Sequence, residues 1–368
     1  MKLRLTAAAG LSAALLLTAC AANEIPSQPA DSGTPGETTP GETAPSTLEG
    51  ILSGKGASSA KVAQETWIAA FQTANAGVTI NYSPDGSGAG RTAFQKGGAD
   101  FAGSDRAFKI EENVPGFAAC TDTSTAIDVP IYVSPIAIIY NLDGVDELNL
   151  TPEVAAQIFR GDVLNWNDPA IAAVNPGVTF PDLVITSVHR SDESGTTLNF
   201  TDYLSVAASG VWTDDPAEVW PIQGGEAAKG TSGVVAAVTG GSGTIGYADA
   251  SQAGTAKIAK IGAEGAFAGP TPDAVMQAVD ASPLEEGRPD NDIAIALDRA
   301  APGYPLVLIS YGIACAEYKD ATQGELVREY FAYLASEEGQ AAAAESAGST
   351  PLSSGLTEKV LAAIATIK

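Results

Sequence analysis

Turns rich in glycine, serine and threonine stand at three points of the chain where an apolar, strand-like run gives way to a helix-like pattern. They comprise residues 58–59, 86–90 and 190–197. Strands and helices that alternate along a chain favour an α/β fold, in which the loops after the strands lie at one edge of the sheet. A fourth polar segment, residues 104–105, follows another short apolar run. The sequence therefore predicts an α/β protein in which these turns converge on one small ligand.

The third of these turns has the residues of an anion site. Arg190 supplies a rigid fork of hydrogen-bond donors, and Gly195 lets the backbone come close to a ligand. Ser194 and Thr196 add hydroxyl donors where a helix could begin, and the first N–H groups of a helix are free. The alternative is an ordinary helix N-cap, but the pair Arg190 and Asp192 favours an anion site.

The chain carries a large excess of acidic residues. Its 368 residues, enough for two domains or lobes, include 19 basic and 44 acidic side chains, so the net charge is -25. Such a protein repels nucleic acid and anionic membrane surfaces, and we expect no nucleic-acid partner. An anion site here must work through short, oriented donors in a cleft that holds little water.

The N-terminus has the features of an export signal. The apolar residues 5–19 follow two basic residues and are shorter than the roughly 20 residues that span a bilayer. They lead into residues 17–20, Leu-Thr-Ala-Cys, which resemble the bacterial lipobox whose cysteine is acylated. We expect a lipoprotein signal peptide over residues 1–20 and a lipid anchor on Cys20, at the outer face of the cytoplasmic membrane. The alternative is an ordinary signal peptide followed by a coincidental cysteine.

Residues 21–50 have the composition of a tether. Proline, glycine, threonine, serine and glutamate recur there, and few apolar side chains are available for a core. We therefore expect a disordered tether that ends where the folded part begins, near Ile51.

Two cysteines, Cys120 and Cys315, remain once Cys20 is assigned to the lipid. Export would place them in an oxidising compartment, where disulfides form. They are either bridged or two buried free thiols, and we favour the disulfide.

The rest of the chain alternates between strand-like and helix-like patterns. Two long apolar runs, residues 129–140 and 304–314, are typical of buried strands, the first being one strand or two. Residues 325–368 indicate a helix, a loop and a helix, whereas residues 250–299 give no clear assignment. Residues 241–246 match the dinucleotide fingerprint G-x-G-x-x-G, but a helix-like run precedes them, so we expect a tight helix-to-strand turn.

His189 is the only histidine of the chain. A metal cluster of histidine and cysteine is therefore not expected, and a Ser-His-Asp triad would have to use this residue. Because His189 adjoins Arg190 in a strand, we expect it to pack or to face solvent. A surface phosphatase with Ser87 or Ser194 as nucleophile would lack a convincing general base, so we expect no enzyme and no cofactor.

Four segments, in this order, resemble the phosphate-binding protein of high-affinity phosphate ABC importers. Residues 54–59 resemble the family's G-x-G-A-T-F, and residues 81–90 match N-Y-x3-G-S-x-x-G. Residues 100–105 match D-F-x-x-S-D, and residues 190–196 match R-x-D-x-S-G-T. The ordered set is specific, although no single member would be.

The resemblance implies a two-lobed periplasmic-binding-protein fold of type II, with lobes joined by a two-stranded hinge. The two long apolar runs become the crossing strands. Lobe 1 would hold residues 51–132 and 308–368, and lobe 2 residues 133–307. Cys120 and Cys315 would then lie in the same lobe.

The resemblance also transfers a ligand set to this chain. The implied ligand residues are Ser58, Ser59, Ser87, Asp105, Arg190, Ser194, Gly195 and Thr196, with Asp192 holding the arginine. Phosphate near neutral pH still carries a proton and sulfate does not, so a carboxylate acceptor at Asp105 would favour phosphate. The alternative for Asp105 is an N-cap or a surface carboxylate. Ser59 stands where the family has an aromatic residue, and we expect Lys55 and Arg91 to be solvated surface residues.

The expected function is capture of inorganic phosphate between the lobes and its delivery to an ABC permease, by a monomeric lipoprotein. Receptors of the same fold for sulfate, molybdate or phosphonate are the nearest alternative, and Asp105 argues against the fully ionised ones. An adhesin or immune-exposed scaffold would leave the four convergent loops unexplained.

Overall fold

The computed structural model describes residues 47–368. The expected signal peptide, the acylated Cys20 and nearly all of the expected tether lie outside this range. The first strand, β1 (Glu49–Gly56), begins two residues before the expected start at Ile51. None of the helices within residues 47–368 is both long and apolar enough to cross a membrane.

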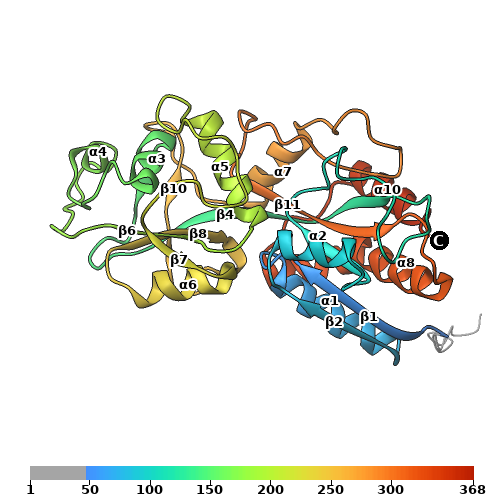
Figure 1. The fold of residues 1–368 in the computed structure, drawn as a ribbon. Coiled ribbons are helices and arrows are strands. Elements are labelled where there is room, and N and C mark those ends of the chain that lie inside the picture. The colour runs from blue at the N-terminus through green and yellow to red at the C-terminus, as the bar shows by residue number, and fades with distance from the viewer. Residues whose placement is uncertain (1–46) are drawn as a thin grey trace, which may run out of the picture. The chain divides into compact units, whose positions relative to one another are not determined.

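A mixed nine-stranded sheet forms the framework (Figure 1). Its strands lie in the order β2, β1, β3, β11, β4, β8, β6, β7, and β9 also pairs with β4. The strands besides β1 are β2 (Gly77–Ser83), β3 (Phe101–Ser104), β4 (Ala126–Asn141), β6 (Thr186–Arg190), β7 (Glu226–Ala228), β8 (Thr244–Asp249), β9 (Lys257–Ile258) and β11 (Val307–Cys315). A separate pair joins β5 (Asn149–Leu150) to β10 (Lys260–Ile261).

Strand β4 belongs to two halves of this sheet. Its residues 126–135 pair antiparallel with β11, and its residues 136–141 pair antiparallel with β8. The first half-sheet is therefore β2, β1, β3, β11 and residues 126–135, and the second is residues 136–141, β8, β6 and β7. The apolar run expected as one buried strand or two is one strand of 16 residues.

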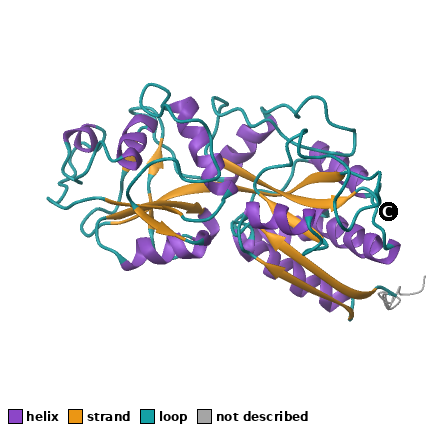
Figure 2. Cartoon of the chain, viewed as in Figure 1, coloured by secondary structure: helices purple, strands orange, loops and turns teal. Residues whose placement is uncertain are grey.

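Helices pack around both half-sheets (Figure 2). Those of the first half are α1 (Lys61–Ala74), α2 (Ser87–Gln95), α8 (Ala321–Ala335), α9 (Glu337–Ala347) and α10 (Ser354–Ile364). Those of the second half are α3 (Pro152–Arg160), α5 (Gly195–Ala207) and α6 (Gly230–Gly240). Two more helices are α4 (Pro169–Ala173) and α7 (Pro272–Asp280), and one turn of 3-10 helix, η1 (Ala250–Gln252), follows β8.

The prediction of a helix, a loop and a helix near the C-terminus is wrong, because three helices occupy this part of the chain. The extra boundary is Ser336, whose backbone is extended and whose hydroxyl accepts a hydrogen bond from Gly339 N. A serine in this position caps the start of α9 and ends α8. The expected helix-to-strand turn is confirmed, since α6 ends at Gly240 and β8 begins at Thr244.

Alternation along β4 determines where α6 packs. Ala137 and Ile139 share an apolar cluster with Val234 and Val238 of α6. Ile138 points to the opposite face, into the main core. Helix α6 is therefore attached to one face of the second half-sheet, directly after β7. Because β7 runs parallel to β6, with Ala228 paired to Arg190, the start of α6 lies beside the turn that follows β6.

Residues 284–295, which had no clear assignment, pack against the first half. Asp128 N of β4 donates to Asp292 Oδ1 at 3.0 Å, and Ile293 N donates to Asp128 O at 2.7 Å. Asn291 Nδ2 donates to Thr366 Oγ1, after α10, at 2.9 Å. This segment of the expected lobe 2 therefore forms hydrogen bonds with the first half.

The predicted disulfide is confirmed. Cys120 and Cys315 are bridged at an S–S distance of 2.00 Å across a sequence separation of 195 residues. Cys315 ends β11, and Cys120 lies in the segment that leads into β4. The bridge therefore ties two segments of the first half.

A buried carboxyl group lies where β4 passes between the half-sheets. Asp249, at the end of β8, is fully buried and pairs with Ile136 in the ladder. Its carboxyl accepts hydrogen bonds from Tyr132 Oη at 3.1 Å and from Ser251 N at 3.0 Å. Burial raises the pKa of Asp249 to about 7, and the nearby charge of Asp105 adds to this shift. The folded protein therefore favours the protonated form of this carboxyl over the ionised form.

Removal of the disulfide should destabilise the protein. We expect the double variant Cys120→Ala/Cys315→Ala to lose about 2–5 kcal/mol of its free energy of unfolding, because the long loop is no longer closed in the unfolded chain. Urea unfolding of the variant and the oxidised wild type measures the loss, and reduced wild-type protein is the control. An unchanged unfolding midpoint would contradict a stabilising role for the bridge.

Asp249 should cause the free energy of unfolding to fall as the pH rises toward about 7. Its pKa is raised in the folded protein, so its stabilising effect is complete below the unfolded pKa of about 4 and is lost as the pH rises through about 7. Relative to Asp249→Asn, the free energy of unfolding of wild type should fall by up to about 1.4 kcal/mol per pH unit in this window. Urea unfolding at several pH values measures both curves. The control is Asp122→Asn, whose carboxyl is 97% exposed; parallel curves for wild type and Asp249→Asn would refute the assignment.

Candidate functional site

The polar turns of the two halves come together at the starts of four helices. Ser58 and Ser59 precede α1, and Ser87 begins α2. The turn after β6 leads into α5, and Gly230 begins α6. The first N–H groups of a helix lack partners within the helix and carry a partial positive charge. Helix starts that meet in this way favour the binding of an anion.

Asp105 lies at the centre of these turns and is 4% exposed. Ser59 Oγ donates to its Oδ1 at 2.6 Å, and Thr196 Oγ1 donates to its Oδ2 at 3.0 Å. Its own N–H donates to Ser87 Oγ at 3.1 Å. The Asp105 carboxylate therefore connects Ser59 of the first half with Thr196 of the second, and the backbone N–H of Asp105 adds the Ser87 turn.

The carboxyl of Asp105 is shielded from water. Burial raises its pKa, while the hydroxyls of Ser59 and Thr196 and the charge of Arg190 oppose the shift. Each carboxylate oxygen can accept more than one hydrogen bond. Asp105 therefore retains the capacity to accept a hydrogen bond from a ligand.

Arg190 supplies the positive charge of the site. It ends β6, is 3% exposed, and donates from Nε to Asp192 Oδ1 at 2.8 Å and from Nη2 to Asp192 Oδ2. Gly230 N, at the start of α6, donates to the same Asp192 Oδ1 at 3.0 Å. Burial of Asp192 opposes its ionisation, but the guanidinium outweighs it and lowers the pKa of this carboxyl. Asp192 thus fixes Arg190 and offsets its charge.

The start of α5 lies against the first half. Ser194 caps the helix by accepting a hydrogen bond from Thr197 N at 3.1 Å, so the ordinary N-cap is present within the site. A Cβ on Gly195 would lie 2.6 Å from Asp105 Cβ and 2.8 Å from Ser87 Oγ. Only glycine allows the turn to approach this closely.

Two residues of the second half that the sequence analysis did not single out contact Ser58 and Ser59. Thr231 Oγ1 lies 3.0 Å from Ser58 Oγ, which also accepts a hydrogen bond from Thr231 N at 3.1 Å. Gln252 Nε2 donates to the carbonyl oxygens of Ser58 and Ser59, both at 2.8 Å. Residues 230–233, Gly-Thr-Ser-Gly, are one more segment rich in glycine and hydroxyl residues, and they form the first turn of α6. That composition would have identified Thr231, whereas Gln252 lies in a stretch without a sequence signal.

All eight residues expected to bind the ligand are buried in this arrangement. They are Ser58, Ser59, Ser87, Asp105, Arg190, Ser194, Gly195 and Thr196. Since hydrogen bonds cross from one half to the other, the structure represents a closed arrangement of the two halves. It offers hydroxyls, helix N–H groups and one guanidinium as donors and one carboxylate as an acceptor, which together suit a small, partly protonated oxyanion.

Among residues 47–368, neither Ser87 nor Ser194 has a general base as a hydrogen-bond partner. Ser87 Oγ accepts from Asp105 N, and Ser194 Oγ accepts from Thr197 N. His189 stacks on Trp220 with ring centroids 5.1 Å apart, and its Nδ1 lies 3.0 Å from Arg190 O. Within residues 47–368 no group of three or more histidine, cysteine or acidic side chains is arranged to hold a metal ion.

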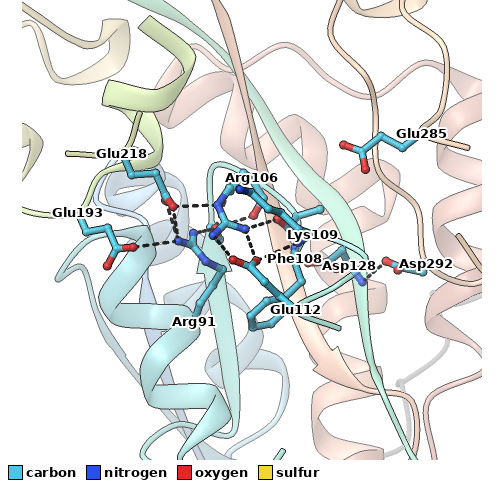
Figure 3. A network of polar contacts seen from close by, with 12 residues as sticks. Arg91, Arg106, Phe108, Lys109, Glu112, Asp128, Glu193, Glu218, Glu285 and Asp292 are labelled. Atoms are coloured by element: carbon cyan, nitrogen blue, oxygen red, sulfur yellow. Dashed lines mark hydrogen bonds and ion pairs between the residues drawn. The ribbon is translucent and has the colours of Figure 1, made fainter. Parts of the chain in front are cut away.

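Arg91 does not have the exposed position expected from the sequence. It is 4% exposed, and its guanidinium contacts Ser104, Glu193 and Glu218 (Figure 3). The prediction of a solvated residue is wrong for Arg91 because carboxylates from the other half surround it. Lys55 remains partly exposed and pairs with Asp85 at 2.9 Å.

Comparison with known proteins shows the family of this chain. The PBP superfamily domain matches residues 33–338. The phosphate-binding protein PstS 3 of Mycobacterium leprae is 38% identical over 295 residues, which cover 76% of this chain and 77% of that protein. The phosphate-binding protein PstS 2 of Mycobacterium tuberculosis is 34% identical over 358 residues, which cover 95% of this chain and 94% of the relative.

Solved structures share the fold. A high-affinity periplasmic phosphate-binding protein, PfluDING, solved with bound phosphate, matches with a TM-score of 0.67 at 24% identity, over 85% of this chain and 93% of that chain. A putative phosphate ABC transporter substrate-binding protein with bound phosphate, from Clostridium perfringens, matches with a TM-score of 0.59 at 20% identity, over 82% and 100% of the two chains. The expected α/β periplasmic-binding-protein fold is thereby confirmed. This chain belongs to the PstS family of phosphate-binding proteins, within the PBP superfamily.

Proposed function

We propose that this protein captures inorganic phosphate between two lobes on the outer side of the cytoplasmic membrane and delivers it to an ABC importer. The single observation that carries the proposal is Asp105, a buried carboxylate among hydroxyls, helix starts and Arg190. The relatives of this protein are named as phosphate-binding proteins, and two similar solved structures contain phosphate. The activity is binding rather than catalysis.

Selectivity comes from the acceptor at Asp105. Monohydrogen and dihydrogen phosphate carry a proton through which they can donate a hydrogen bond to this carboxylate. Sulfate has no such proton, so one of its anionic oxygens would lie against an anionic oxygen of Asp105. Such an unpaired contact in a site without water costs a few kcal/mol. Sulfate and molybdate are therefore rejected, although a donor-only site would hold them.

Closure of the lobes accounts for capture. Lobe 1, residues 51–132 and 308–368, contributes Ser58, Ser59, Ser87 and Asp105, and lobe 2, residues 133–307, contributes Arg190 and the start of α5. A ligand that contacts both lobes shifts the population toward the closed arrangement by the free energy of these contacts. The protein acts as a monomer, tethered by residues 21–50 to a lipid on Cys20.

Calorimetry tests the function directly. Titration of phosphate into the full-length protein should give one site per chain, and sulfate should bind at least roughly 100-fold more weakly, because an unpaired anionic contact costs a few kcal/mol. Arg190→Gln should abolish measurable binding, whereas the matched control Lys55→Gln, outside the site, should bind like wild type. Absence of phosphate binding by wild type, or equal binding of sulfate, would refute the proposal.

The acceptor role of Asp105 can be tested separately. We expect Asp105→Asn to lower the affinity for phosphate by about 10-fold or more, on the order of the cost of losing a hydrogen bond to a charged group. The affinity for sulfate should rise, because the amide can donate a hydrogen bond where the carboxylate repels the anion. Competition between the two anions measures the selectivity. Asp85→Asn, which changes a carboxylate paired with Lys55, is the control. Unchanged selectivity in Asp105→Asn would assign the discrimination to another residue.

A further inference from the structure

An ion-pair network joins the two halves beside the candidate anion site (Figure 3). Its centre is Glu218, in the loop between α5 and β7 of the second half. Arg91 Nη2 donates to both carboxylate oxygens of Glu218, at 2.7 and 2.6 Å, and Arg106 Nε donates to Oε2 at 2.9 Å. Arg91 lies in α2 and Arg106 follows β3, so both arginines belong to the first half. A single carboxylate therefore binds two guanidinium groups across the cleft.

The first half holds the two arginines in place by itself. Arg91 Nη1 donates to Ser104 Oγ at 2.8 Å, and this hydroxyl donates to Arg106 O at 2.6 Å. Arg106 Nη1 and Nη2 donate to the two oxygens of Glu112 at 2.7 and 3.1 Å. These contacts persist when the halves separate, since all their members lie in the first half. The arginines are thus preorganised for a partner that arrives with the second half.

Charge balance in the network depends on closure. Arg106 has a carboxylate partner in its own half, Glu112. The carboxylates that contact Arg91 are Glu218 at 2.6 Å and Glu193 at 3.7 Å, and both come from the second half. Glu193 is half exposed, so Glu218 is the close partner of Arg91.

Burial makes these contacts more than a surface pair. The side chain of Arg91 is 5% exposed, that of Glu218 12% and that of Arg106 14%. Exposed ion pairs contribute little because water and salt screen them. Removal of one partner from a buried, hydrogen-bonded pair leaves the other charge without compensation, which strongly disfavours the closed arrangement. In separated halves the same groups regain water, and the penalty disappears.

Glu218 is also connected to the anion site. Its carbonyl oxygen accepts a hydrogen bond from Ser194 N, at the start of α5, at 2.9 Å. On the other side, Arg106 directly follows Asp105 in the chain. The network therefore contacts the turn that carries Ser194 and the segment that carries Asp105. A displacement of either lobe that releases the ligand must also break the contacts of Glu218.

We propose that Glu218 is a latch, a positioning residue that retains bound phosphate by pairing with Arg91 and Arg106 only when the lobes are closed. The proposal rests on the proposed function, since it concerns the release of that ligand. The latch does not touch phosphate itself. It slows the reopening of the closed lobes and does not affect the rate at which phosphate binds to the open lobes.

Electrostatics without a latch predicts the opposite effect of a mutation. Glu218 is a carboxylate near an anion site, so its neutralisation would by charge alone strengthen the binding of phosphate. A latch predicts weaker binding, because the closed arrangement loses a buried partner of two arginines. The sign of the change therefore separates the two explanations.

The test is the variant Glu218→Gln in the full-length protein, with release of radiolabelled inorganic phosphate measured after dilution into unlabelled phosphate. We expect the dissociation rate to rise roughly 10- to 100-fold, as for the loss of one partner of a buried, hydrogen-bonded charge pair, and the association rate to change little. Unfolding of the phosphate-free proteins should give the same stability for wild type and variant, a result that a merely structural role for Glu218 would not produce.

Glu112→Gln is the matched control. This variant removes the carboxylate of Glu112, the partner of Arg106 that lies in the first half. Closure does not form this ion pair, so the rate of phosphate dissociation should stay within about twofold of wild type. Equal acceleration in both variants, or tighter binding in Glu218→Gln, would overturn the latch while leaving phosphate binding intact. If wild type itself failed to bind phosphate, the proposed function would fall, and the latch with it.

Discussion

The closed arrangement of the two halves depends on the hydrogen bonds that Asp105 accepts. Ser59 of its own half and Thr196 of the other half each donate to one of its oxygens. A buried carboxylate is stable only while its partners are in place. Separation of the halves removes Thr196 and admits water, whereas closure restores the partner and excludes water. The acceptor that we propose for the ligand is therefore also a contact between the two halves.

Positive charge is used sparingly around this carboxylate. Arg190 is offset by Asp192, so most of the favourable field for an anion comes from the starts of four helices and from hydroxyls. Two further cations near the cleft, Arg91 and Arg106, are paired with carboxylates. On a chain with a net charge of -25, these helix starts and hydroxyls attract an anion only at short range. Distant anions are repelled, and only an anion inside the cleft is held.

Much of this arrangement could be predicted from the sequence, because local composition determines local structure. Glycine and hydroxyl residues between a strand and a helix identified the turns with Ser58, Ser87 and Arg190 correctly, and the structure brings them together. The position of Arg91 could not be predicted, since its partner Glu218 lies 127 residues away and only the tertiary fold joins them. Gln252 was missed for a similar reason, because a single turn of 3-10 helix gives no periodic signal. Sequence patterns therefore carry little information about contacts between residues that lie far apart in the chain.

The disulfide between Cys120 and Cys315 bears on how the cleft can open. Strand β11 pairs with β4 from Cys315, opposite Ala126, to Val307, opposite Pro135. The covalent tie lies near one end of this ladder, and the passage of β4 into the second half-sheet lies at the other. Two strands pinned at one end cannot slide past each other. The bridge therefore keeps β11 and residues 126–135 of β4 together as one unit of the first half, and any opening of the cleft leaves this unit intact.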